Sequence, residues 1–288
     1  MKNYMRIDTF LSGGDFLAAN GSFLESREAV NNLILGIAGR YLTVDEGCVS
    51  PPLFLSIADN DSKRLACLMT PPQRLVLYSD GKDTAEALGA LAGHLIGKNI
   101  EIPGVIGPAE VCGQFADLWS SKKGVARRLS MNERAYELKK VIDPDYASGH
   151  FMKAGEDDLD LLSEWTVSFS AEALGDDMGE DAARELISKK IKAGDAFIWN
   201  DGGPVTMACA ARPTSNGIAV NLVYTPPGYR KKGYATSCVA KLSAELLGRG
   251  YKFCTLFTDL KNPVSNDIYQ KIGYEAVCDF NQYDFHAV

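Results

Sequence analysis

Residues 230–235 read Arg-Lys-Lys-Gly-Tyr-Ala, and this short stretch decides how the second half of the chain folds. It lies between an apolar stretch expected to form a strand, residues 219–224, and an amphipathic stretch expected to form a helix, residues 234–247. A turn from a strand into a helix leaves backbone N–H groups unpaired at the positive end of the helix dipole. Gly233 lets the backbone approach an anion closely, and the three basic residues before it add positive charge. The stretch therefore predicts a site for a pyrophosphate group.

A second informative segment lies downstream. Residues 262–274 read Asn-Pro-Val-Ser-Asn-Asp-Ile-Tyr-Gln-Lys-Ile-Gly-Tyr and follow an expected strand, residues 253–259. Pro263 ends that strand because proline cannot donate to a ladder. Two isoleucines one helical turn apart indicate a short helix, and Gly273 is placed to end it.

Both segments resemble the GNAT N-acetyltransferases. The pattern R-x-x-G-x-A after Val-Asn-Leu-Val-Tyr-Thr is similar to that family's acetyl-CoA signature, and the downstream segment is similar to its asparagine after the fifth strand and tyrosine on the next helix. The order of elements over residues 145–288 is also that of the GNAT fold, β-α-α-β-β-β-α-β-α-β. We call residues 230–235 the phosphate turn. Before it, this order is built from a strand at 150–154, helices at 158–174 and 181–193, and strands at 196–199, 205–211 and 218–224.

The first half predicts the order α-α-β-β-β-α-β-α-β, which repeats the second half without repeating its sequence. At the position of the phosphate turn, residues 79–84 read Ser-Asp-Gly-Lys-Asp-Thr, and two aspartates there repel a pyrophosphate. We therefore expect an α/β (α+β) chain of two tandem GNAT-like domains, each a mixed, mostly antiparallel sheet flanked by helices. Residues 1–143 form a degenerate, non-catalytic domain and residues 144–288 an acetyltransferase domain. An unrelated α+β first domain with the same element order is the alternative.

Composition limits the function classes. The chain has 288 residues, a formal net charge of −7 and a pI near 5.1, which argues against broad nucleic-acid binding. No apolar run is long enough to cross a bilayer, and residues 1–10 lack the apolar core of a signal peptide. The seven cysteines are dispersed without a C-x-x-C pair, which is typical of reduced thiols in a cytoplasmic protein. The histidines lack metal-ligand spacing, so no metal site is expected; the oligomeric state stays open.

The resemblance implies acetyl-CoA as cofactor and assigns its contacts. The splayed fourth strand binds the pantetheine arm, the turn and the first helical residues bind the pyrophosphate, and an asparagine and a serine lie beside the arm. The positions that match are Leu222, Val223 and Tyr224 on the strand, Arg230, Lys231, Lys232, Gly233, Tyr234, Ala235 and Thr236 at the turn, and Asn262 and Ser265. Tyr269 matches the tyrosine that many members use to protonate the leaving thiolate; packing against the core is the other interpretation.

The general base is not identifiable from the sequence. Residues 217–225 contain no carboxylate, although some GNAT members carry a glutamate on this strand. A remote carboxylate acting through water, an amine that arrives deprotonated, and lost activity stay open. Glu172 is a candidate for the first, and a solvated surface glutamate is its ordinary interpretation.

The expected function is transfer of an acetyl group from acetyl-CoA directly to a primary amine of a small-molecule or peptide acceptor. A non-catalytic acyl-CoA-binding regulatory protein is the alternative. By resemblance the acceptor side includes Trp165, Phe169, Trp199 and Tyr283, although filling the core is a competing use for these rings. The acceptor itself is not fixed by the fold.

Overall fold

The computed structural model describes residues 5–44, 50–175 and 177–287; Cys48 lies outside them. By its internal contacts the chain divides into unit 1, Met1–Ala135 with Val277–Val288, and unit 2, Tyr136–Ala276. This division differs from the expected boundary at 143/144. Val277–Val288 belong to unit 1 because the last strand pairs antiparallel with a strand of that unit, placing Phe280 opposite Pro108 and Asp284 opposite Gly104.

Unit 1 is a mixed sheet with helices on both faces, and its strands run in the order β1-β2-β3-β4-β5-β12-β6. From β1 to β4, neighbouring strands pair antiparallel, and β5 pairs antiparallel with β12. The pair β4 and β5 is parallel. Its elements are β1 (Met5–Phe10), α1 (Gly13–Glu25), α2 (Asn32–Ala38), β2 (Leu53–Asp59), β3 (Ser62–Met69), β4 (Leu75–Ser79), α3 (Thr84–Gly97), β5 (Gly104–Pro108), α4 (Ala109–Lys123), β6 (Val125–Leu138) and β12 (Glu275–Ala287).

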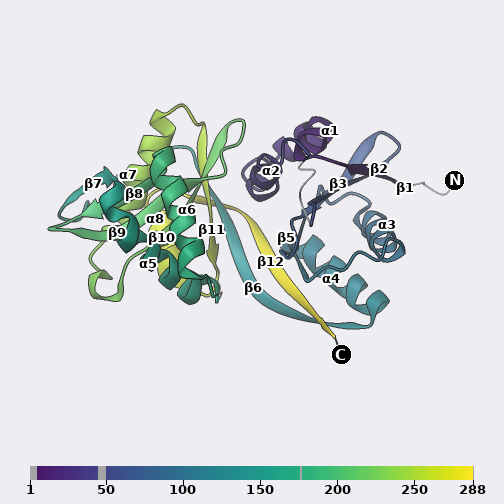
Figure 1. Ribbon diagram of the computed structural model, residues 1–288. Helices are drawn as coiled ribbons and strands as arrows, with labels where there is room; N and C mark the ends of the chain where they lie inside the picture. Colours follow the sequence, from purple (N-terminus) through teal and green to yellow (C-terminus); the bar gives the residue numbers. More distant parts are fainter. Residues whose placement is uncertain (1–4, 45–49, 176, 288) are drawn as a thin grey trace. The chain divides into compact units, whose positions relative to one another are not determined.

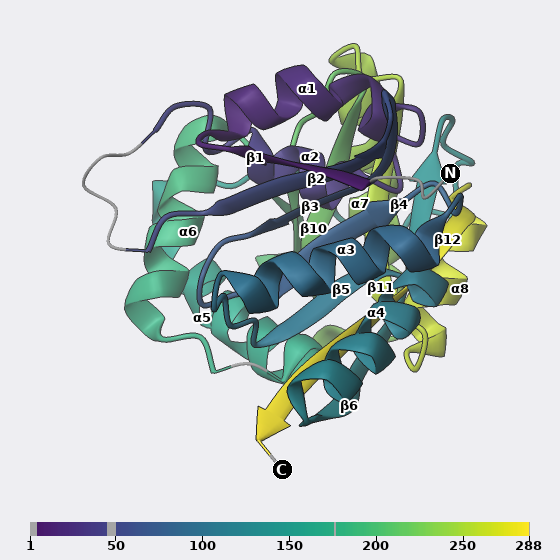
Figure 2. The same ribbon diagram turned by 90° about the vertical axis from the view of Figure 1, so that its right-hand side faces the viewer.

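The two faces of the unit 1 sheet are covered by different helix pairs. Helices α3 and α4 lie on one face, and α1 and α2 lie on the other (Figures 1 and 2). Under α3 and α4, fully buried side chains such as Leu91 and Phe115 pack against Leu65 and Leu77 of the strands. Strand β2 is buried on both faces, which explains its nearly continuous apolar sequence.

Unit 2 repeats this architecture around a sheet with the strand order β6-β11-β10-β9-β8-β7, to which β6 contributes residues 136–138. Strands β10 and β11 are parallel, whereas β7, β8, β9 and β10 pair antiparallel. Its elements are β7 (His150–Lys153), α5 (Leu159–Phe169), a π-helical turn (Ser170–Leu174), α6 (Glu180–Ala193), β8 (Ala196–Asn200), β9 (Pro204–Ala211), β10 (Gly217–Tyr224), α7 (Tyr234–Gly248), β11 (Phe253–Asp259) and α8 (Pro263–Lys271), with short 3₁₀ turns at Glu156–Asp158 and Pro227–Tyr229.

Two hydrophobic clusters cover the faces of the unit 2 sheet. Leu162, Trp165 and Ile187 of α5 and α6 pack on one face. Residues of α7 and α8, among them Leu242 and Tyr269, pack on the other. The element order β-α-α-β-β-β-α-β-α-β predicted for residues 145–288 is confirmed along the chain, although its last strand, β12, belongs to unit 1. The same order describes β1 to β6, where β1 completes the order that the sequence had left without its first strand.

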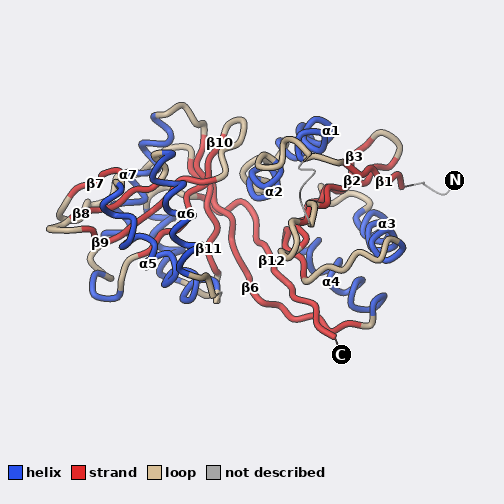
Figure 3. Tube along the Cα trace, viewed as in Figure 1, coloured by secondary structure: helices blue, strands red, loops and turns tan. Residues whose placement is uncertain are grey.

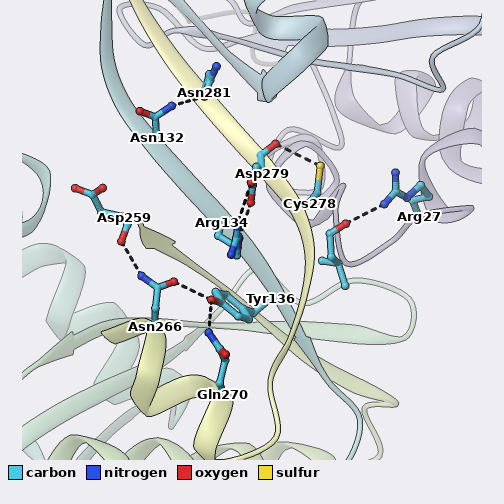
Figure 4. Close-up of polar contacts among 11 residues, drawn as sticks. Arg27, Asn132, Arg134, Tyr136, Asp259, Asn266, Gln270, Cys278, Asp279 and Asn281 are labelled. Carbon is cyan, nitrogen blue, oxygen red and sulfur yellow. Dashed lines mark hydrogen bonds and ion pairs between the residues drawn. The ribbon is translucent and has the colours of Figure 1, made fainter. Parts of the chain in front are cut away.

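Strands β6 and β12 are the longest of the structure, and within unit 1 they run side by side (Figure 3). Polar side chains join them there: Asn132 donates to Asn281 at 2.7 Å, and Arg134 forms an ion pair with Asp279 at 2.6 Å (Figure 4). Within the described ranges, no helix is both long and apolar enough to cross a bilayer.

Candidate functional site

The candidate site of unit 2 begins where β10 leaves β11. Ladder pairs between the two parallel strands join Gly217–Ala219 to Phe253–Thr255 and extend no further along β10. On its other edge, the register of β10 with β9 shifts between Asn221 and Tyr224, and Leu222 has a φ of 50°. This combination is a β-bulge, which bends a strand and redirects its backbone groups. The backbone of Leu222 and Val223 therefore lies outside the regular ladder.

The turn after β10 presents backbone to a ligand. Lys231 and Gly233 both have positive φ, 64° and 79°, and Gly233 is the N-cap of α7. Glycine has no capping side chain, so the N–H groups of the first turn, residues 234–236, are left uncapped by their own N-cap. The 15-residue helix adds the positive end of its dipole at the same point. The geometry suits an anion such as a pyrophosphate.

Side chains of this turn have different surroundings. Lys231 and Lys232 are exposed, and the ammonium of Lys232 lies 5.8 Å from the ring centre of Tyr229. Arg230 instead turns back toward the preceding chain: its Nε donates to the Thr225 carbonyl at 2.8 Å. The Arg230 side chain is also exposed, at 44%, but this hydrogen bond holds it beside Thr225.

Arg230 also meets the π-helical turn that follows α5. Its guanidinium donates to Glu172 Oε2 at 2.6 Å, and the hydroxyl of Tyr224 donates to Glu172 Oε1 at 2.9 Å. The hydrogen bond from Arg230 lowers the pKa of Glu172, whereas burial and the bond to Glu172 raise the pKa of Tyr224. Glu172 is therefore an ionised, weakly basic carboxylate with a hydrogen bond on each oxygen, which disfavours it as the general base.

Tyr234, the first residue of α7, is buried, and a hydrogen bond holds its hydroxyl. Its hydroxyl donates to Asp201 Oδ2 at 2.5 Å, and the same oxygen accepts a hydrogen bond from Ser148 at 2.8 Å. Asp201 lies in the turn between β8 and β9. Ala235 and Thr236 follow, half-buried, on the first turn of the helix. The sequence placed Tyr234 among the cofactor contacts, but it gave no sign that Asp201 holds it.

The segment after β11 is organised around two asparagines. Asn262 is the N-cap of α8, and its side chain accepts the backbone N–H of Ser265 at 3.1 Å. Asn266 donates to the carbonyls of Asp259 and Asn262 and accepts a hydrogen bond from the Tyr136 hydroxyl at 2.8 Å (Figure 4). Asn262 and Ser265 were both expected to lie beside the pantetheine arm. Here the amide oxygen of Asn262 caps a helix, and Asn266, which the sequence analysis missed, fixes the position of that cap.

Tyr269 lies on α8, 7% exposed, with its ring 5.9 Å from the ring of Tyr274 at an interplanar angle of 67°. Burial raises the pKa of Tyr269, so its phenol keeps its proton at neutral pH. The hydroxyl of Tyr274 is engaged with Ser243 at 2.9 Å. Of these two buried phenols, Tyr269 is the one whose hydroxyl makes no hydrogen bond within the described part of the chain.

The α5 face of β10 carries further polar atoms. Asn221 lies opposite Cys209, whose side chain packs in the cluster under α5 and α6, so both residues face those helices. The amide oxygen of Asn221 and the hydroxyl of Ser170 are buried side-chain atoms without a hydrogen-bond partner among the described residues. Buried orphan acceptors of this kind are uncommon and are often satisfied by a ligand or water. Neither was singled out from the sequence.

The aromatic residues expected at the acceptor side separate into three environments. Trp165 and Phe169 pack in the cluster under α5 and α6, and Trp165 meets the ring of Tyr224 at 6.3 Å. Trp199 packs in the cluster on the opposite face, under α7 and α8. Tyr283 lies in the core of unit 1. The structure thus brings two of the four to the α5 face of β10. In the described ranges, no cluster of three or more metal-ligating side chains is found.

Comparisons with known proteins agree with this geometry. Residues 202–283 match the family described as FR47-like protein. The structure resembles an acetyltransferase of the GNAT family from Colwellia psychrerythraea (13% identity, TM-score 0.56, covering 98% of this chain and 100% of that one). It also resembles a GCN5-related N-acetyltransferase from Sphaerobacter thermophilus (13% identity, TM-score 0.63, 97% and 94%).

The chain has the fold of the GNAT acetyltransferases. A tandem GNAT protein from the clavulanic acid biosynthesis pathway matches over 97% of this chain and 98% of its own, at 8% identity and a TM-score of 0.57. The tandem GNAT fold predicted from the sequence is therefore confirmed. No curated protein matches the sequence.

Proposed function

We propose that unit 2 is an acyl-CoA-dependent N-acetyltransferase that passes the acetyl group of acetyl-CoA directly to a primary amine. The observation that carries the proposal is the phosphate turn of α7, where Gly233 in the left-handed region opens an uncapped helix in the connection that follows a bulged strand. The GNAT fold and the FR47-like match over residues 202–283 support the same activity.

The residues that would hold the cofactor fit its chemistry. The N–H groups of residues 234–236 and the exposed ammonium groups of Lys231 and Lys232 suit the pyrophosphate. The bulged backbone at Leu222 and Val223 suits the amides of the pantetheine arm, since a splayed strand edge binds an extended chain through backbone hydrogen bonds. When bound, acetyl-CoA supplies the thioester whose carbonyl carbon the amine attacks.

Within this chain, Tyr269 is the proton donor we propose for the departing thiolate. Its phenol is protonated at neutral pH, and its hydroxyl makes no hydrogen bond with the described protein. On the acceptor side, the orphan oxygen of Asn221 is suited to accept an N–H of the amine. β10 carries no carboxylate, so we expect the amine to enter deprotonated and its nitrogen to release one proton to solvent as the amide forms.

Isothermal titration of the purified protein with acetyl-CoA and with CoA is the first test. Micromolar binding of one ligand per chain supports the proposal and justifies a screen of amines by thiol release. Absence of binding by both ligands would remove the proposed function. Binding of both without turnover of any amine would favour the second candidate, a non-catalytic acyl-CoA-binding regulator, for which the lack of a strand carboxylate speaks.

A further inference from the structure

The phosphate turn of unit 2 is flanked by two carboxylates that lie outside it. Glu172 accepts from the guanidinium of Arg230, at the start of the turn, and Asp201 accepts from the hydroxyl of Tyr234, just after Gly233. The two acids come from different places in the sequence, a π-helical turn after α5 and the turn between β8 and β9. Neither position is near residues 230–235 along the chain.

The first anchor consists of the contacts that the Arg230 side chain makes with Thr225, Glu172 and Tyr224. Nε holds the Thr225 carbonyl at 2.8 Å, the guanidinium holds Glu172 at 2.6 Å, and its carbon lies 5.8 Å from the ring centre of Tyr224. Glu172 is in turn held by the Tyr224 hydroxyl at 2.9 Å. Arg230 is therefore tied to the last residue of β10 and to the residue after it, so the guanidinium fixes where the turn leaves the bulged strand.

The second anchor fixes where the turn enters α7. Asp201 Oδ2 bridges the hydroxyls of Tyr234 and Ser148, at 2.5 and 2.8 Å. The backbone N–H of Ala147 donates to the Ser237 hydroxyl at 2.9 Å, one helical turn after Tyr234. The first turn of α7 is thus held to neighbouring segments through its Tyr234 and Ser237 side chains, and these hydrogen bonds use none of the backbone N–H groups of residues 234–236.

The negative charge of a carboxylate is unfavourable beside a site that binds an anion. An acid close to an anion site repels the anion, and neutralising it should tighten binding. Removing a carboxylate that orders the turn should instead weaken the affinity for the anion. The N–H groups that bind the anion converge only while the left-handed residues Lys231 and Gly233 are held in place. The two roles therefore predict opposite signs for the change in affinity.

We propose that Glu172 and Asp201 are positioning residues that hold the two ends of the phosphate turn in the conformation that binds the CoA pyrophosphate. The inference rests on the proposed function for its ligand. It also assigns Arg230 to the scaffold of the turn and leaves the direct charge contact with the phosphates to Lys231 and Lys232.

The test compares Glu172→Gln and Asp201→Ala with Glu164→Gln, an exposed acid on α5 that changes the net charge equally. Alanine is used at 201 because the carbonyl oxygen of an asparagine could accept both hydrogen bonds that Oδ2 accepts. A glutamine keeps one carbonyl oxygen for Arg230 or Tyr224 but turns its own NH₂ toward the other donor. We expect the Kd for CoA to rise about 3- to 10-fold in each anchor variant, and by less than about 2-fold in the control. Unchanged or tighter binding by both anchor variants would overturn the proposal.

Trypsin supplies a second measurement that needs no ligand, because the turn itself contains cleavage sites after residues 230, 231 and 232. If the anchors hold the turn, limited proteolysis there should be about 3- to 10-fold faster in Glu172→Gln and Asp201→Ala than in Glu164→Gln. Equal cleavage rates in all variants would contradict the positioning role even if CoA binding had changed. If the anchor variants are cleaved faster but the parent protein does not bind CoA, the proposed function is refuted. The two carboxylates would still be shown to hold the turn.

Kinetics distinguish positioning from chemistry. With an amine substrate in hand, both anchor variants should raise KM for acetyl-CoA while kcat and its pH profile stay as in the parent. For S-acetylpantetheine, which lacks the pyrophosphate, kcat/KM should not change. A fall in kcat with unchanged KM in Glu172→Gln would make Glu172 part of the proton transfer and overturn the proposal.

Discussion

The two units use carboxylates in opposite ways at equivalent turns. In each, a strand that is antiparallel to one neighbour and parallel to the next leads into a helix: β4 into α3 in unit 1, and β10 into α7 in unit 2. In unit 2 the acids lie outside the turn and hold its ends. In unit 1 they lie within it: Asp80 accepts the N–H of Lys82 at 3.0 Å, and the hydroxyl of Ser79 accepts the N–H of Gly81. The unit 1 turn thus satisfies the N–H groups of Gly81 and Lys82 with its own side chains, although Asp83 does not cap α3.

The N-cap residues show the same difference at one position. Asp83 of α3 and Gly233 of α7 are both left-handed, with φ of 47° and 79°. Asp83 tolerates this conformation because a short polar side chain is among the few that do, and it forms an ion pair with Arg64 at 3.2 Å. The left-handed backbone at the N-cap is therefore shared, whereas the charge placed on the turn differs between the units.

Replacing Gly233 with valine should have the largest effect. A β-branched residue is strained at this φ, so the turn must rotate away from its anion-binding shape, although the added Cβ itself has room, 3.8 Å from Ala147. We expect the Kd for CoA to rise about 100-fold or more by calorimetry. Gly233→Asn is the matched control, because asparagine accepts the left-handed region; its loss should be several-fold smaller. Retained binding in the valine variant would remove the cofactor assignment.

Replacing Tyr269 with phenylalanine should lower kcat about 100-fold while the Kd for CoA changes little, because the ring still fills its place beside Tyr274. Burial raises the pKa of Tyr269, so the donor stays protonated as pH rises. The parent enzyme should therefore lose no activity through this group below about pH 10. A thiol-release assay across pH measures both effects. An unchanged rate in the variant would show that Tyr269 only packs.

Neutralising the lysines of the turn should have a smaller, salt-dependent effect. In the double variant Lys231→Gln/Lys232→Gln we expect the Kd for CoA to rise about 10-fold at low ionic strength and less at high salt, because both ammonium groups are exposed. Titrations at two salt concentrations measure this. Arg230→Gln should instead act mainly through the conformation of the turn, so its loss should depend less on salt. An equal salt dependence in both variants would return Arg230 to the phosphate contacts.

Much of the fold was predictable from the sequence because strand and helix periods, a few prolines and the turn residues specify local structure. The phosphate turn was predictable for the same reason, since its glycine, basic residues and flanking elements are contiguous. Glu172, Asp201 and Asn266 act through partners that are 33 to 130 positions away, and no local pattern encodes such pairs. The pairing of β12 with β5 joins residues about 170 positions apart and was missed for that reason.

The smallest change tests whether charge alone silenced unit 1. The variant Asp80→Asn/Asp83→Gly removes both acids and gives the turn a glycine N-cap like that of α7. We still expect one CoA per chain by calorimetry, with the parent's affinity, because the strands differ as well. The register of β3 with β4 runs without a bulge, and a Cβ on Gly107 of β5 would lie 2.5 Å from the Leu77 carbonyl oxygen of β4. In unit 2, by contrast, β10 bends at Leu222 beyond its last pair with β11. Two CoA molecules bound per chain of this variant would show that the two acids were the whole difference between the units. Adding Gly233→Val to it should then abolish binding in unit 2 only and leave one CoA bound.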